Sequence, residues 1–284
     1  MHPLYISDLD GTLLDTQAKL TPFAFNTLKS LLLEKVPITI ASARSAVSMK
    51  LLLGELPIQL PVITFNGSCI DRFDTGEHIR IFDVDAGFKH EIYACVCSEG
   101  FAPFVSAFDG KRDNLYYEQT INAGMEWYLA NRVEVKDHRL RNPVRLISVL
   151  DEFIISINVI GKRDALKVLQ NELTTHYNEF VQLHLFDNLY SPGWSWLTIH
   201  DCKATKDQAI KEMMIMEGLY DHELVAFGDN DNDIAMFELA DRAVAVANSS
   251  PGALAAADEV IGPHDQDSVV KYLLKDARLK AAGA

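Results

Sequence analysis

Acidic residues with a regular spacing follow the first apolar segment of the chain. Asp8 and Asp10 are separated by one residue and are followed by Gly11 and Thr12. Two carboxylates spaced in this way can face a single crevice if the chain leaves a strand at this point. Gly11 permits the turn that this requires, and Thr12 offers a hydroxyl and a backbone N–H. A polar loop that caps the next element is the simpler alternative for an isolated Asp-x-Asp, and it stays open at this point.

A second acidic run lies at residues 228–233. It reads Gly-Asp-Asn-Asp-Asn-Asp and crowds carboxylate and carboxamide groups after Asp229. Asp229 is placed to give an oxygen ligand to a hard cation, and Mg²⁺ suits such a site because it accepts a few carboxylates and bridges to substrate phosphate. An N-cap before the next helix is the alternative, since Asp and Asn are common there. A calcium loop is a rival, but the run lacks a Glu at the required spacing.

Two further residues are suited to holding an anion. Ser42 ends an apolar segment, and free N–H groups at the start of a following helix would cradle a phosphate there. A helix cap explains Ser42 equally well. Lys206 opens a predicted helix, where the helix dipole disfavours a cation. A lone lysine is usually only solvated, but this placement favours a functional role for Lys206.

Short apolar segments precede these residues and predict the strands of one sheet. Their length and composition suit burial on both faces; they are residues 4–8, 37–42, 61–65, 224–227 and 243–247. Helical patterns separate them. This alternation predicts right-handed crossovers and an α/β fold with a doubly wound parallel sheet. A ligand site is expected at the carboxyl ends of the strands, where the candidate residues lie.

The middle of the chain has a different pattern and predicts a separate unit. A hairpin is expected around residues 74–76, and after it helical and strand-like segments are mixed. We therefore expect a core made of residues 1–82 and 191–284, with an α+β unit at residues 83–190 inserted into it. In this division the strand-like residues 194–199 belong to the core.

Composition limits the classes of function. The chain has 284 residues, with 40 Asp and Glu against 26 Lys and Arg, which gives a net charge of -14. A nucleic-acid-binding protein normally has an excess of Lys and Arg, so this composition argues against a nucleic-acid partner. Because the chain is acidic, positive charge for an anionic substrate must come from a metal ion or a few basic side chains. No segment is long and apolar enough for a membrane span, and the N-terminus does not resemble a signal peptide. The 4 cysteines match no zinc or disulfide pattern, which favours a reduced cytoplasmic setting. A frayed tail is expected over residues 275–284.

Together, and in this order along the chain, the candidate residues resemble the motifs of the haloacid dehalogenase superfamily. Residues 8–14, Ser42, Lys206 and residues 228–233 look like its first to fourth motifs. Asn66-Gly67, the long insertion between the second and third motifs, and the late Val-Ala-Val-Ala-Asn segment look like its Cof-type phosphatase branch. The resemblance implies a Rossmann-like core with an inserted cap domain. The chain departs from the common pattern at Ala43, where relatives often have Gly.

The resemblance also implies a role for each residue. Asp8 would be the nucleophile that forms an aspartyl-phosphate, and Asp10 would protonate the leaving oxygen and then activate water. Magnesium would be held by a carboxylate oxygen of Asp8, the backbone carbonyl of Asp10 and the carboxylate of Asp229, with Asp233 bracing them. The phosphate oxygens would be bound by the side chains or backbone N–H groups of Ser42, Ala43, Lys206, Asn232 and Gly11.

The implied partner is a small phosphate ester, such as a sugar phosphate or a phosphorylated cofactor, and the protein is expected to be a monomer or homodimer. Cap residues would choose the substrate; the candidates are Arg112, Asp113, Tyr116, Tyr117, Arg145, Asn188 and Tyr190. A catalytically idle relative that binds a phosphorylated ligand or a protein is the alternative, but the intact motifs favour an enzyme. Asp10 argues against a dehalogenase, and the short interval between Thr12 and Ser42 argues against a phosphomutase.

Overall fold

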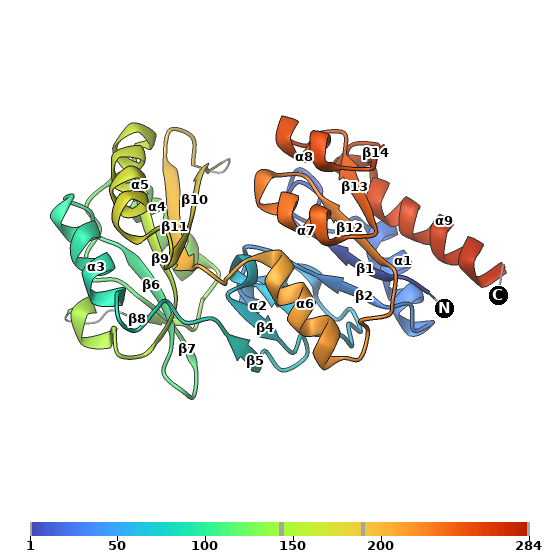
Figure 1. Cartoon of the computed structure of the whole chain (residues 1–284), viewed down its shortest axis with the longest axis horizontal. Coiled ribbons are helices and arrows are strands. Elements are labelled where there is room, and N and C mark those ends of the chain that lie inside the picture. The colour runs from blue at the N-terminus through green and yellow to red at the C-terminus, as the bar shows by residue number, and fades with distance from the viewer. Residues whose placement is uncertain (1, 142–144, 189–190, 283–284) are drawn as a thin grey trace. The chain divides into compact units, whose positions relative to one another are not determined.

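The computed structural model describes residues 2–141, 145–188 and 191–282, with only the backbone described for residues 281 and 282. The chain forms two compact units. Unit 1 comprises Met1–Arg80 and Thr205–Ala284, and unit 2 comprises Ile81–Ala204. Figure 1 shows the helices and strands of each unit.

Unit 1 is built on a five-stranded parallel sheet in the order β14-β13-β12-β1-β2. Its strands are β1 (Leu4–Ser7), β2 (Ile38–Ile40), β12 (Leu224–Gly228), β13 (Arg242–Val246) and β14 (Glu259–Ile261). β1 lies between β12 and β2, and all its residues are buried, as in a sheet covered on both faces. The doubly wound parallel sheet that the sequence predicts is confirmed.

Helices cover both faces of this sheet (Figure 1). They are α1 (Pro22–Leu33), α2 (Ala46–Leu53), α6 (Lys206–Met216), α7 (Ile234–Leu239), α8 (Pro251–Ala256) and α9 (Ser268–Ala282). One hydrophobic core joins α1, α2 and α9 to the sheet face that carries Tyr5, Val225 and Phe227. α7 packs on β12 and β13, and α8 packs on β13. Sequence signals fix the start of α1, because Pro22 is its first residue and the side chain of Thr21 accepts the N–H of Ala24.

A smaller sheet completes unit 1. It contains β3 (Val62–Thr64), β4 (Cys69–Asp71) and β5 (His78–Ile81) in that order, and β3 is antiparallel to β4. A single parallel bridge between Ala41 and Ile63 places β3 next to the segment that follows β2. Residues 61–65, the third apolar segment of the sequence, thus run parallel to the segment after β2, but their strand β3 belongs to this smaller sheet. A short turn, η1 (Phe65–Gly67), joins β3 to β4.

Unit 2 has a six-stranded sheet in the order β10-β11-β9-β6-β7-β8, antiparallel except between β7 and β8. Its strands are β6 (Phe104–Phe108), β7 (Asp113–Tyr116), β8 (Leu140–Arg141), β9 (Phe153–Gly161), β10 (Val181–Asp187) and β11 (Ser195–Asp201). The helices α3 (Lys89–Ser98) and α5 (Arg163–Tyr177) share one core with the sheet, and α4 (Ala123–Glu134) shares another with Phe104 and Trp196. The inserted α+β unit thus has the mixed pattern that the sequence predicts.

Two expectations need correction. The second boundary of the insertion lies after Ala204 rather than at 190/191, because residues 194–199 belong to β11, which pairs with β9 and β10 of unit 2. The C-terminal segment is helical rather than frayed over most of its length. α9 extends through it, since Leu273 and Ala277 are buried against the core of unit 1.

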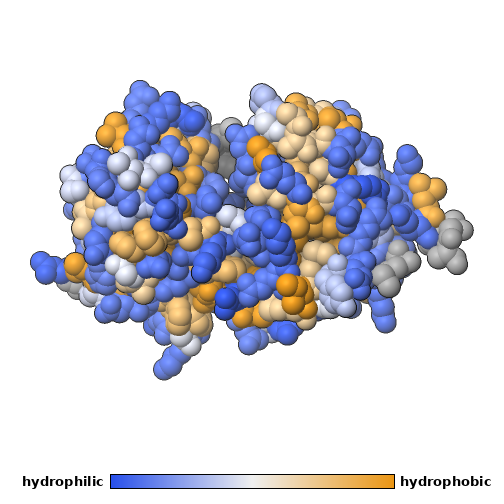
Figure 2. Space-filling model, in the orientation of Figure 1, coloured by the Kyte–Doolittle hydropathy of each residue, from blue (hydrophilic) through white to orange (hydrophobic). Residues whose placement is uncertain are grey.

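The surface is mixed in character. Figure 2 shows hydrophilic residues over much of the viewed face of each unit, with hydrophobic residues scattered among them. None of the helices in the described ranges combines the length and apolar character that a membrane crossing would need. Within those ranges none of the four cysteines forms a disulfide.

Candidate active site

The candidate residues of unit 1 gather at the carboxyl ends of β1, β2 and β12. Asp8 follows β1 directly, and its backbone N–H donates to the carbonyl of Phe227 in β12 over 2.9 Å. This bond extends the parallel pairing of the two strands by one residue. The side chain of Asp8 is consequently buried at the centre of the sheet edge.

The loop after Asp8 approaches the loop after β12 very closely. Gly11 has a φ of 79°, and a Cβ atom at this position would collide with the carboxylate of Asp229. Only glycine combines this left-handed backbone with so little space. The hydroxyl of Thr12 donates to Oδ1 of Asp229 over 2.7 Å, and the side-chain amide of Asn248 donates to the carbonyl of Gly11 over 2.8 Å. The bond from Thr12 joins the two loops, and the bond from Asn248 joins the Gly11 loop to the segment after β13.

Lys206 is the first residue of α6 and is almost completely buried. Its ammonium donates to Oδ1 of Asp8 over 2.7 Å and to Oδ1 of Asp233 over 2.6 Å. The two carboxylates explain why a cation is stable at a helix N-terminus, where the dipole alone would disfavour it. Burial lowers the pKa of Lys206, but the attraction of Asp233 and Asp8 outweighs it and raises the pKa above its usual range.

In the loop after β12, some acidic and amide side chains cap backbone N–H groups and others belong to the charged cluster around Lys206. Oδ2 of Asp233 accepts the backbone N–H groups of Asp229 over 2.9 Å and Asn230 over 3.0 Å. Asn230 and Asp233 form a reciprocal capping box at the short 3₁₀ turn Asp231–Asp233, which leads into α7, but within the described ranges no side chain caps α7 itself. Capping does not account for Asp229, whose side chain lies against Thr12 instead. The two explanations apply to different residues of one run.

The cluster holds more negative than positive charge. Oxygen atoms of Asp8, Asp229 and Asp233 all lie within 4.8 Å of one another, and Lys206 is the cation that bonds to two of these residues. Burial raises the pKa of Asp8 well above its usual range against the attraction of Lys206, and Asp233 and Asp229 raise it further. Burial likewise raises the pKa of Asp229 to about 6, although the hydrogen bond from Thr12 opposes the shift. A cation among these carboxylates would relieve the excess charge.

The donor set fits magnesium, which prefers oxygen ligands. Both oxygens of Asp233 already accept hydrogen bonds, from Lys206 and from backbone N–H groups. Asp8 and Asp229 are therefore the better carboxylate ligands, and Asp233 is placed to brace them. The sequence resemblance implies the same division, and these metal-binding roles, like that of the Asp10 carbonyl, stay predictions.

The side chain of Asp10 is paired with Arg44, a residue to which the sequence alone gives no role. Its carboxylate forms a bidentate pair with Arg44, with distances of 2.6 Å from Nε to Oδ2 and 2.6 Å from Nη2 to Oδ1. The guanidinium also donates to Ser48 over 3.1 Å, which fixes its direction. The signal was present, because Arg44 stands two residues after Ser42, but the sequence does not show that the two loops meet.

Ser42 and Ala43 lie in the loop between β2 and α2. The N–H of Ser42 donates to the carbonyl of Ile63 over 2.9 Å, and Ala43 is exposed. The cap of α2 is Ser45, whose hydroxyl accepts the N–H of Ser48. The capping alternative for Ser42 is therefore wrong.

Asn232 donates from its side-chain amide to Oδ1 of Asn66 over 3.0 Å. Asn66 lies in the turn between β3 and β4, and it is a second residue to which the sequence analysis gave no role. Unit 1 therefore brings together Asp8, Gly11, Lys206, Asp229 and Asp233. It places Asp10 with Arg44, and Asn232 with Asn66.

The candidate substrate residues of unit 2 have varied surroundings. Tyr116 is largely buried and donates to Glu152 over 2.8 Å, and Arg112 is exposed and pairs with Asp109 at 3.5 Å. Asn188 lies next to Asp187 at the end of β10, and Arg145 precedes a short helical turn. Tyr190 lies outside the described residues. The buried hydrogen bond of Tyr116 indicates a structural role for that residue.

Comparison with known proteins gives concordant results. The profile of one family, described as haloacid dehalogenase-like hydrolase, matches residues 5–273. A 5-amino-6-(5-phospho-D-ribitylamino)uracil phosphatase of Bacillus subtilis is 24% identical over 286 residues, covering 94% of this chain and 95% of the relative. A pyridoxal phosphate phosphatase of Escherichia coli is 24% identical over 282 residues, with the same coverage of 94% and 95%.

Solved structures agree on the fold. The crystal structure of a haloacid dehalogenase-like hydrolase from Bacteroides thetaiotaomicron is similar with a TM-score of 0.78 at 18% identity, covering 98% of this chain and 100% of that chain. At this identity the likeness shows the fold alone.

Proposed function

The chain belongs to the haloacid dehalogenase-like hydrolase family, and from this premise we propose that it is a magnesium-dependent phosphatase of small phosphate esters that forms an aspartyl-phosphate on Asp8. One observation carries the proposal. Asp8 is buried at the sheet edge beside Asp229 and Asp233 and is bound by the ammonium of Lys206. A buried carboxylate held in this way is suited to nucleophilic attack on phosphorus.

In the first half-reaction, Asp8 attacks phosphorus, the bond from phosphorus to the ester oxygen breaks, and Asp10 gives a proton to the leaving alcohol. In the second, Asp10 takes a proton from a water molecule that attacks the phosphorus of the aspartyl-phosphate, which releases phosphate and restores Asp8. Bound Mg²⁺, held by Asp8, Asp229 and the carbonyl of Asp10, would neutralise the charge of carboxylate and phosphate.

Positive charge and N–H donors from this chain would hold the phosphoryl oxygens. We assign this task to Lys206, Ser42 and Asn232, with the backbone N–H groups of Gly11 and Ala43, because phosphoryl transfer depends mainly on positioning and charge neutralisation. Arg44 engages both carboxylate oxygens of Asp10, so the proposed proton transfers require this pair to open when substrate binds.

The substrate proposed is a sugar phosphate or a phosphorylated cofactor. The relatives named above act on a phosphoribityl compound and on pyridoxal phosphate, which are esters of this kind. Unit 2 is proposed as the cap that selects the alcohol part of the substrate. A cytoplasmic location, where the cysteines would stay reduced, and a monomeric or homodimeric state are proposed with it.

The test is hydrolysis of a generic aryl phosphate by the purified protein. Turnover should require Mg²⁺, stop with EDTA and return when Mg²⁺ is restored. Asp8→Asn should abolish it, while Asp221→Asn, a change at an exposed aspartate before β12, should leave it unchanged. A hydroxylamine-sensitive phosphoryl group on the peptide that contains Asp8 should be found in quenched enzyme. Activity retained by Asp8→Asn would exclude the nucleophile assigned here.

A calorimetric titration with inorganic phosphate distinguishes an enzyme from a catalytically idle protein that only binds a phosphorylated ligand. Phosphate binding without hydrolysis of any ester in a broad panel of phosphorylated metabolites would favour a binding module. Hydrolysis of one ester far more efficiently than the others would identify the substrate.

A further inference from the structure

The turn η1 between β3 and β4 has an unusual backbone. Phe65, Asn66 and Gly67 are buried and have φ angles of 50°, 57° and 106°. A bulky residue such as phenylalanine rarely adopts a positive φ, and such a conformation persists only where the surroundings determine it. Gly67 cannot be replaced without disturbance, because a Cβ atom there would collide with the backbone of Thr205. Strain of this kind often marks a functional segment.

Each residue of the turn contacts a segment of the proposed phosphate site. The N–H of Phe65 donates to the carbonyl of Arg44 over 3.0 Å, and the N–H of Asn66 donates to the carbonyl of Ser42 over 3.0 Å. The side chain of Asn66 accepts the amide of Asn232 over 3.0 Å. Gly67 lies against Thr205, the residue before Lys206. One short turn thus contacts the Ser42 loop, Asn232 and the start of α6.

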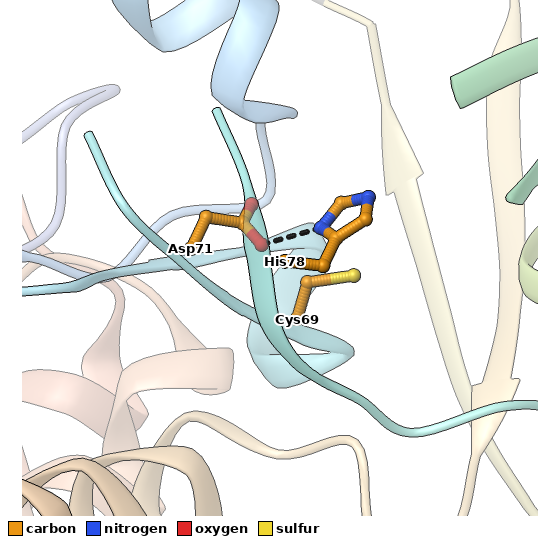
Figure 3. Close-up of side chains that lie close together, drawn as sticks. All are labelled: Cys69, Asp71 and His78. Atoms are coloured by element: carbon orange, nitrogen blue, oxygen red, sulfur yellow. Dashed lines mark hydrogen bonds and ion pairs between the residues drawn. The ribbon is translucent and has the colours of Figure 1, made fainter. Parts of the chain in front are cut away.

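A buried polar cluster anchors the turn on its strand side. Figure 3 shows Asp71 and His78 facing each other, with Cys69 beside them. Nδ1 of His78 lies 2.6 Å from Oδ1 of Asp71, and the hydroxyl of Thr64 donates to Oδ2 of Asp71 over 2.6 Å. Cys69, Asp71 and His78 are of types that can bind a metal, but both oxygens of Asp71 are already engaged by Thr64 and His78. The cluster therefore fixes Thr64, the residue immediately before the turn.

We infer that Asn66 is a positioning residue of the phosphate site, which holds Asn232 through its side chain and the Ser42 loop through its backbone. The inference rests on the proposed function. The ordinary preference of asparagine for left-handed turns is the competing explanation, and it predicts no effect of the side-chain amide on phosphate binding.

The decisive variant is Asn66→Gly. Glycine accepts the left-handed backbone without strain, so this change removes the amide and leaves the turn. With an aryl phosphate as substrate, KM and the inhibition constant of inorganic phosphate should each rise about tenfold, the equivalent of one net hydrogen bond, and kcat should change less than about twofold. Asn66→Ala should show the same rise and also a lower thermal midpoint, because alanine is strained at this φ.

A double-mutant cycle with Asn232→Ala tests whether Asn66 acts through Asn232. If it does, Asn66→Gly should have little further effect on KM or phosphate inhibition in the Asn232→Ala background. The matched control is Lys35→Gly, since Lys35 is exposed, has a φ of 62° and stands before β2, at the other end of that strand from Ser42. Its kinetic constants should equal those of the wild type.

The outcomes separate this inference from the proposed function. An active wild type whose KM and phosphate inhibition are unchanged by Asn66→Gly would overturn the inference alone, and so would additive effects in the cycle. A wild type that neither hydrolyses esters nor binds inorganic phosphate would overturn both.

Discussion

Each unit contains a buried cluster of charged side chains, and these two clusters differ in how completely their carboxylates are paired with cationic side chains. In unit 2, Asp137 forms a bidentate pair with Arg139 at 2.9 and 2.7 Å and lies 3.7 Å from Arg132. In unit 1, the carboxylates of Asp8 and Asp233 share the ammonium of Lys206, and Asp229 adds further negative charge. The first cluster is balanced in the sense that both oxygens of its one carboxylate are paired with arginine, whereas the second has a surplus of carboxylates.

The pKa values of the aspartates move in opposite directions. Burial raises the pKa of Asp137, but the bonds from Arg139 outweigh it and hold the pKa below its usual range. Burial raises the pKa of Asp8, and Lys206 does not compensate for it. A balanced cluster needs nothing further and serves stability. An unbalanced one is completed by a cation and a substrate, which is the arrangement that the proposed function requires.

The largest expected effect comes from breaking the unbalanced cluster. Lys206→Met should lower kcat/KM by at least about 10³-fold, because it removes a cation from the phosphoryl site. It should also destabilise the magnesium-free protein by about 3 kcal/mol, since it leaves buried carboxylates unpaired. Steady-state kinetics and urea unfolding measure the two effects. Asp8→Asn should abolish activity without this loss of stability, because it reduces the like charge; a large destabilisation by Asp8→Asn would contradict the comparison.

The balanced cluster should show the reverse pattern. Asp137→Asn should lower the free energy of unfolding by about 3 kcal/mol, because it leaves the guanidinium of Arg139 without its buried partner. It should leave kcat/KM with an aryl phosphate within about twofold. Urea unfolding and kinetics on the same preparation test this, with Asp151→Asn as an exposed control. A loss of activity without a loss of stability would remove the distinction between the clusters.

Magnesium should stabilise one cluster only. At 100 times its dissociation constant, Mg²⁺ should raise the free energy of unfolding of the wild type by about 2.7 kcal/mol by mass action. The increase should vanish in Asp229→Asn and remain in Asp137→Asn. Thermal unfolding with and without Mg²⁺ gives the readout. An equal gain in Asp229→Asn would place the binding of Mg²⁺ elsewhere.

The smallest effect concerns acid sensitivity in unit 2. Burial lowers the pKa of His200 from 6.5 to about 3, and repulsion from His184 adds to the shift. Below pH 6.5 the unfolded chain binds a proton at this residue that the folded protein does not, so stability falls with pH until the folded pKa is reached. Between pH 6.5 and pH 5 the loss should be about 2 kcal/mol.

His200→Leu should remove this part of the pH dependence, and His176→Gln, at an exposed histidine, should retain it. Urea unfolding at several pH values distinguishes them. Identical pH profiles for the wild type and His200→Leu would show that other groups cause the acid sensitivity.

Local patterns in the sequence located much of the candidate site. Asp8, Ser42 and Asp229 each follow a short apolar segment, and such segments form parallel strands whose carboxyl ends share one edge. Long-range contacts were not accessible in this way. The pairing of Arg44 with Asp10 and of Asn66 with Asn232 depends on loops that meet only in the folded chain.

The errors have similar causes. The alternation in residues 194–199 predicts a strand but not its partner, and only the pairing of β11 with β9 shows that it belongs to unit 2. The spacing of Val269, Val270, Leu273 and Ala277 is helical, but the polar residues between them hide this pattern in the sequence. Ser42 and Ser45 are equally good caps by residue type, and only the observed hydrogen bonds separate them.

The contact between Gly67 and Thr205 has a consequence for how the protein can vary. Thr205 is the first residue after the insertion, and Lys206 follows it at once. The point where the chain returns to unit 1 is therefore set by a glycine in unit 1 itself. A single methyl group added at Gly67 would collide with the backbone of Thr205, so the position next to Lys206 tolerates no side chain on this glycine.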